Sequence, residues 1–135
     1  MSQERVEYNV EPLAALFAAD EDIDLAMIFG SAVDGGLRAD SDVDVAVLTR
    51  SPLTAERKGA IIRVVAELTG RPVDLVDLRS AGVAVTSQIL RHGRRLFERR
   101  PSVFPALLSR TLADVVDFLP YRERILRERR RAWIR

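Results

Sequence analysis

The sequence predicts an α/β (α+β) fold, in which a small mixed sheet is flanked by helices and followed by a C-terminal helical arm. Segments with apolar residues at helical spacing alternate along the chain with short apolar runs that are typical of buried strands. The chain has 135 residues, 47% of them hydrophobic. This size and composition suit one folded domain with one core over residues 1–135.

Composition excludes several classes of protein. Cysteine is absent, which excludes disulfides, thiolate catalysis and cysteine-ligated zinc. The first nine residues lack the apolar core of a signal peptide, and the longest apolar stretches are far shorter than a membrane span. The net charge of +1 argues against a broad nucleic-acid surface. We therefore expect a cytoplasmic protein without membrane or direct nucleic-acid contacts.

The first elements are a short helix and a buried strand. The helix is expected from Glu11 to Ala19, with Pro12 in its first turn, where no intrahelical hydrogen bond is lost. Its apolar face consists of Leu13, Leu16 and Phe17. The apolar run from Asp24 to Phe29 predicts a strand. Gly30 follows it, where a residue without Cβ lets backbone N–H groups approach a phosphate closely.

The next strand carries two acids. Three valines alternate with Asp42, Asp44 and Ala46, so the geometry of a strand places both carboxylates on one face, about 7 Å apart along the backbone. Two such groups can hold Mg²⁺. Gly30 and Ser31 precede Asp42 by ten intervening residues, and the Ser31 hydroxyl can donate to a phosphate oxygen. A lone pair of alternate acids also occurs on ordinary exposed strands, but its coincidence with Gly-Ser favours a site.

A third acid lies in the strand-like run from Pro72 to Leu78. Asp74 has apolar neighbours there, and three carboxylates in one cleft would raise one another's pKa values unless divalent cations neutralised them. Asp77 is the alternative. Residues three apart on a strand face opposite ways, so only one of the two can enter the cleft. We favour Asp74, because Asp77 lies where the chain leaves the strand.

The remaining elements are three helices and an edge strand. Thr54 caps a helix that runs to about Thr69, and Gly70 ends it. Its expected apolar stripe is Ile61, Val64, Val65 and Leu68. Ser80 is the expected cap of a helix through Arg91, followed by an edge strand from Arg94 to Glu98. His92, at the end of that helix, is interpreted as a surface residue near the helix dipole.

Ser102 is expected to cap the last helix, with Pro105 at its third position. Its predicted buried stripe is Leu108, Leu112, Val115 and Leu119. Pro120 should break this helix, which leaves an arginine-rich arm from Tyr121 to Arg135. Solvation or docking to a protein partner explains the arm better than nucleic-acid binding.

The Gly-Ser-x10-Asp-x-Asp pattern and the later strand with a central acid resemble the DNA polymerase β-like nucleotidyltransferase superfamily. The short chain resembles its minimal nucleotidyltransferase (MNT) branch over most of residues 10 to 100. The resemblance implies that three acids are catalytic and bind metal, namely Asp42, Asp44 and Asp74. It implies that three residues bind nucleotide, namely Gly30, Ser31 and Ser41. The implied cofactor is a pair of Mg²⁺ ions, with Mn²⁺ as a substitute, and the implied substrate is ATP.

Members of the MNT branch are paired with a HEPN-domain ribonuclease toxin and transfer AMP from ATP to a tyrosine of that toxin, which makes them antitoxins. The resemblance therefore implies a HEPN protein as the partner. Two alternatives stay open. One is a small-molecule nucleotidyltransferase that works as a homodimer. The other is a weak catalyst that silences its partner by docking, which Asp34 favours because many MNT sequences carry a base at that position.

Overall fold

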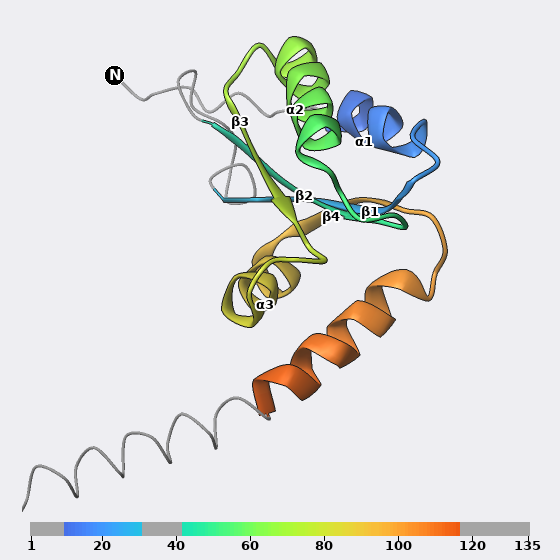
Figure 1. The fold of residues 1–135 in the computed structure, drawn as a ribbon, viewed down its shortest axis with the longest axis vertical. Coiled ribbons are helices and arrows are strands. Elements are labelled where there is room, and N and C mark those ends of the chain that lie inside the picture. The colour runs from blue at the N-terminus through green and yellow to red at the C-terminus, as the bar shows by residue number, and fades with distance from the viewer. Residues whose placement is uncertain (1–9, 31–41, 117–135) are drawn as a thin grey trace, which may run out of the picture.

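A four-stranded mixed sheet is the centre of the molecule (Figure 1). The computed structural model describes residues 10–30 and 42–116. Within them the strand order is β3-β2-β1-β4, with bounds β1 (Ile23–Phe29), β2 (Val43–Thr49), β3 (Val73–Asp77) and β4 (Arg94–Glu98). β1 pairs with both β2 and β4 in antiparallel fashion, whereas β2 and β3 are parallel. The predicted fold class is confirmed.

Helices cover both faces of this sheet (Figure 1). α1 (Glu11–Ala18) and α2 (Ala55–Thr69) lie on one face, and their core contains Leu13, Phe17, Val45, Ile61 and Val65. α3 (Val83–His92) and a helix over residues 103–116 lie on the other face. Their core contains Leu25, Met27, Ala46, Ile89 and Leu107. The chain therefore folds as two apolar layers separated by the sheet.

The alternation along β2 decides which face receives the acids. Val43, Val45 and Val47 are fully buried in the core beneath α1 and α2. Because successive side chains of a strand point to opposite faces, Asp44 and Ala46 lie on the face that α3 covers. Phe29 of β1 packs against the core of that same face. The sequence pattern thus places the acidic side chains beneath α3.

α2 begins and ends as predicted, but its buried stripe is narrower. The Thr54 side chain accepts a hydrogen bond from the Arg57 N–H at 3.1 Å, and Gly70 ends the helix with a φ of 66°. Ile61 and Val65 are buried. The predicted burial of Val64 and Leu68 is wrong, since they are 45% and 44% exposed. The sheet covers only the side chains of α2 that face it directly. Val64 lies to the side and lines an open groove between α1 and α2.

The predicted cap of α3 is also wrong. The helix begins at Val83, with Gly82 as its N-cap. Ser80 instead donates its hydroxyl to a carboxylate oxygen of Asp77 at 3.1 Å. Serine favours such local turns as strongly as helix caps, so the residue type alone does not separate the two outcomes. The edge strand from Arg94 to Glu98 is confirmed as β4.

The last helix starts directly after Ser102, as predicted, but a different stripe is buried. Its inward side is formed by Val103, Leu107 and Thr111, whereas Leu112 is 43% exposed. Leu108 and Val115 are half-buried. The Phe104 N–H donates to a carboxylate oxygen of Glu98 at 2.7 Å, and this contact connects the first turn of the helix to β4.

Leu119, Pro120 and the arm from Tyr121 to Arg135 lie outside the described residues. The expectations for that helix end and for the arm therefore stay predictions. Across residues 10–30 and 42–116, none of the helices combines the length and the apolar character that crossing a bilayer requires.

Candidate active site

Four of the predicted site residues meet at one end of the sheet. Gly30 directly follows β1, and Asp42 directly precedes β2. Asp44 is the second residue of β2, and it pairs with Phe29 in the antiparallel ladder and with Asp74 in the parallel one. Two neighbouring strands and the turn after β1 thus converge on Asp44.

The three acids repel one another at this end. Asp44 is half-buried, while Asp42 and Asp74 are exposed. The pKa of Asp44 is raised above its ordinary value of 3.8, first by burial and then by the negative charges of Asp74 and Asp42. All three causes disfavour the ionised carboxylate. A cation at this end would remove that penalty, so the electrostatics suit a positively charged ligand.

The structure gives Gly30 two reasons to lack a side chain. Its φ of 73° lies in the left-handed region that favours glycine. A Cβ built on Gly30 would collide with the carboxylate of Asp44. The Gly30 turn therefore lies close against Asp44, and a side chain at this position would require the carboxylate to move.

Asp77 lies at the opposite end of β3, where it pairs with Val47. Its carboxylate accepts hydrogen bonds from the Arg79 N–H at 3.0 Å and from the Ser80 hydroxyl at 3.1 Å. These contacts hold the turn after the strand. Of the two candidates for a third acid, the structure thus places Asp74 beside Asp44 and uses Asp77 in a turn.

Ser31 and Ser41 lie outside the described residues, so their predicted contacts with nucleotide stay predictions. In the described part of the chain, no three acidic, histidine or cysteine side chains are already spaced to hold a metal ion. Mg²⁺ is usually bound by one or two carboxylates together with substrate phosphates. The mutual repulsion at Asp44 therefore fits a cation that binds together with a nucleotide.

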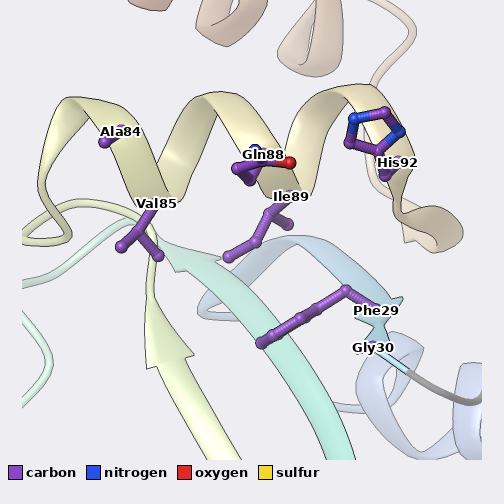
Figure 2. A pocket seen from close by; sticks show the side chains of 7 residues that line it. All are labelled: Phe29, Gly30, Ala84, Val85, Gln88, Ile89 and His92. Carbon is purple, nitrogen blue, oxygen red and sulfur yellow. The ribbon is translucent and has the colours of Figure 1, made fainter.

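A cavity of about 620 Å³ opens beside Gly30, between α3 and the end of β1. Seven residues line it, as Figure 2 shows: Phe29, Gly30, Ala84, Val85, Gln88, Ile89 and His92. Sequence reasoning missed this cavity and interpreted His92 only as a surface residue. His92 is indeed exposed, yet it shares the cavity with Gly30. Ala84, Gln88 and His92 are spaced four residues apart, which places them on one face of the helix. This spacing was the signal in the sequence that could have indicated a shared surface.

Comparisons with known proteins show what this chain is similar to. The chain is 33% identical over 75 residues to the protein adenylyltransferase MntA of Shewanella oneidensis, a match that covers 56% of this chain and 54% of that protein. The chain thus spans about half the length of this curated relative.

Two solved structures have the same fold. One is a crystal structure of a toxin–antitoxin with AMP-PNP, with 24% identity, a TM-score of 0.78 and coverage of 90% of this chain and 98% of the other. Another contains a tri-AMPylated HEPN toxin of Shewanella oneidensis in complex with an MNT antitoxin, with 23% identity, a TM-score of 0.70 and coverage of 87% and 92%.

The family model described as polymerase beta, nucleotidyltransferase matches residues 11–102, a segment that contains all four strands and every described acid of the site. On this match the chain belongs to the polymerase beta nucleotidyltransferase family.

Proposed function

We propose that this chain transfers AMP from ATP to a tyrosine hydroxyl of a HEPN-domain toxin and thereby acts as an antitoxin. The observation that carries the proposal is the position of Asp44, which lies between Asp42 and Asp74 against the Gly30 turn, with a raised pKa. The 33% identity to a protein adenylyltransferase supports the choice of AMP and of a protein acceptor.

Asp42 and Asp44 would hold a divalent cation that neutralises the nucleotide phosphates, and Asp74 would hold a second one. The Gly30 turn lies directly against the Asp44 carboxylate, so its backbone N–H groups would face a phosphate that binds next to this acid. The acceptor oxygen attacks the α-phosphorus while its proton passes to the Asp74 carboxylate. The bond between the α-phosphorus and the bridging oxygen breaks, and pyrophosphate leaves. The product is a phosphodiester between AMP and the acceptor.

The acceptor is expected to come from another protein. All the described elements contribute to one sheet and its two helical layers. Within the described residues, no separate module is available to hold an acceptor over Asp74. We therefore propose that a partner protein presents the hydroxyl.

Transfer can be tested by incubating the protein with a HEPN toxin, ATP and Mg²⁺, and by measuring the intact mass of the toxin. We expect the mass to rise by one AMP residue per transfer, and the toxin to stay inactive after the two proteins are separated. Tryptic mapping should place the adduct on a tyrosine. An unchanged mass, with inhibition that disappears on separation, would instead establish a docking inhibitor. An adduct on an aminoglycoside-like small molecule alone would establish the small-molecule alternative.

Metal dependence can be tested by calorimetric titration with ATP in the presence of Mg²⁺ and again with EDTA. Three carboxylates and a triphosphate repel one another, so we expect ATP to bind only when the cation is present. Mn²⁺ should restore binding after EDTA treatment. Equally tight binding of ATP without any divalent cation would contradict the proposed roles of Asp42 and Asp44.

A further inference from the structure

The cavity beneath α3 continues from the acidic end of the sheet. Gly30 lines the cavity, and it also lies next to the Asp44 carboxylate. A volume of about 620 Å³ lies within the range of roughly 300–1,000 Å³ that is typical of small-molecule sites. A ligand that places a phosphate at Asp44 can therefore extend beneath α3.

The walls of the cavity suit a flat aromatic ring. Phe29 comes from the end of β1, while Val85 and Ile89 point toward it from α3 (Figure 2). Val85 is 49% exposed, although it is a large apolar residue. Exposed apolar surface of this kind inside a hollow marks a place where a ligand is buried. An aromatic ring would cover Val85 and stack near Phe29.

The rim of the cavity carries polar groups that a ring could read. Gln88 and His92 are one helical turn apart on α3, and both are exposed. The amide of Gln88 offers a donor and an acceptor side by side. Adenine presents the matching pair on one edge, and glutamine is a known bidentate partner of adenine N6 and N7.

We propose that this cavity binds the adenine base of the nucleotide and that Gln88 sets the preference for adenine. The inference rests on the proposed function and adds to it the residues that select the base. A phenol ring in the cavity would direct its single hydroxyl at the acids and would make no use of Gln88 and His92. A nucleobase meets both the apolar walls and the polar rim.

The sharpest test exchanges the hydrogen-bonding pattern of one side chain. In Gln88→Glu the carboxylate can only accept, which suits the two adjacent donors of guanine and opposes adenine. We expect the ratio of the Kd values for ATP and GTP to shift toward GTP by about tenfold or more, since one bidentate pair discriminates by roughly that amount. Arg91→Gln is the matched control, because it changes the charge of α3 by the same amount outside the cavity.

A second variant fills the cavity without touching the acids. Ala84 is exposed and lines the cavity, so Ala84→Phe should occupy the place of the base. We expect Mg²⁺-dependent ATP affinity to fall to the level of tripolyphosphate, which has no base, while the affinity for tripolyphosphate itself is unchanged. Circular dichroism and the melting temperature would verify that the variant is folded.

The outcomes separate this inference from the function on which it rests. If both variants leave the affinities for ATP and GTP unchanged while tripolyphosphate still binds, the base lies elsewhere and the inference is overturned. If Ala84→Phe lowers transfer to the toxin without changing ATP affinity, the cavity holds the acceptor ring, which also overturns it. If the wild type binds neither ATP nor tripolyphosphate with Mg²⁺, the proposed function itself fails.

Discussion

Aspartates at the two ends of the sheet have opposite surroundings. At one end Asp24 of β1 is only 7% exposed, and its carboxylate contacts Arg50 at 3.0 Å and Arg100 at 3.6 Å. At the other end Asp44 of β2 is surrounded by the charges of Asp42 and Asp74, which raise its pKa. The ion pairs of Asp24 stabilise the fold, whereas the like charges around Asp44 destabilise it. The acids around Asp44 are therefore better explained by a ligand than by folding.

Arginines at the Asp24 end also donate hydrogen bonds to backbone carbonyls. The Arg79 guanidinium donates to the Thr49 carbonyl at 3.0 Å. Arg99 donates to the carbonyls of Ile23, Ala18 and Asp20 at 3.0, 3.2 and 2.8 Å. Carbonyls at strand and helix ends need such partners. This end of the sheet is therefore closed by its own side chains, whereas the acidic end is where we propose that a cation and a nucleotide bind.

The largest expected effect is the loss of transfer when an acid of the site is neutralised. Asp42→Asn and Asp44→Asn should each lower the rate of AMP transfer by about a hundredfold or more, because a metal contributes several kcal/mol to the transition state and 1.36 kcal/mol corresponds to tenfold. Single-turnover assays with radiolabelled ATP would measure the rate. Asp24→Asn is the matched control and should retain transfer in its folded fraction. An equal loss of the transfer rate in all three variants would show that the acids at the two ends of the sheet do not differ in function.

A comparison within β3 sharpens the assignment of the third acid. Asp74→Asn should lower transfer strongly, since Asp74 lies beside Asp44. Asp77→Asn should change transfer little, because an amide oxygen can still accept from the Arg79 N–H. The same single-turnover assay compares them. A dead Asp77→Asn protein together with an active Asp74→Asn protein would reverse the assignment.

The alternation of valine and aspartate made much of the site predictable. A period of two fixes the face of Asp44 relative to Val43 and Val45, and Gly30 follows an apolar run that is typical of a buried strand. Asp74 was preferred to Asp77 because it matches the family pattern and lies deeper in its strand, but its pairing with Asp44 depends on the parallel register of β2 and β3. Strand register involves residues far apart in the chain, so no local pattern specifies it.

Helix rotation was the least predictable feature. The predicted stripes through Val64 and Leu112 had helical spacing, but the buried side of each helix is rotated away from these two residues. An apolar residue at the edge of a stripe fits the spacing whether or not the sheet covers it. The cavity beneath α3 was missed for a related reason. Phe29 and Gln88 are brought together only by the packing of α3 on β1, and neither residue carries a motif.

A moderate loss of stability is expected when the paired acid is removed. Asp24→Ala should lower the free energy of unfolding by about 1–3 kcal/mol, the usual cost of losing hydrogen bonds to charged groups. Arg50 and Arg100 are more than half exposed and can be rehydrated, which keeps the loss at the lower end of that range. Urea denaturation would measure it. A gain in stability would show that the ion pairs of Asp24 are not structural.

The smallest expected effect has the opposite sign and concerns Asp44, the acid that lies beside two other acids. The folded state raises the pKa of Asp44 above 3.8, so ionisation of this group opposes folding. Its contribution is favourable below pH 3.8, where the protonated form carries no penalty, and it is lost as the pH rises through the raised pKa. Asp44→Asn should therefore increase the melting temperature by a few degrees at pH 7, and this gain should shrink as the pH falls toward 3.8. Mg²⁺ should stabilise the wild type more than the variant, because the cation relieves the same repulsion. Melting curves of both proteins across this pH range, with and without Mg²⁺, would measure these effects. A variant that is less stable than the wild type at pH 7 would show that repulsion at Asp44 does not destabilise the fold.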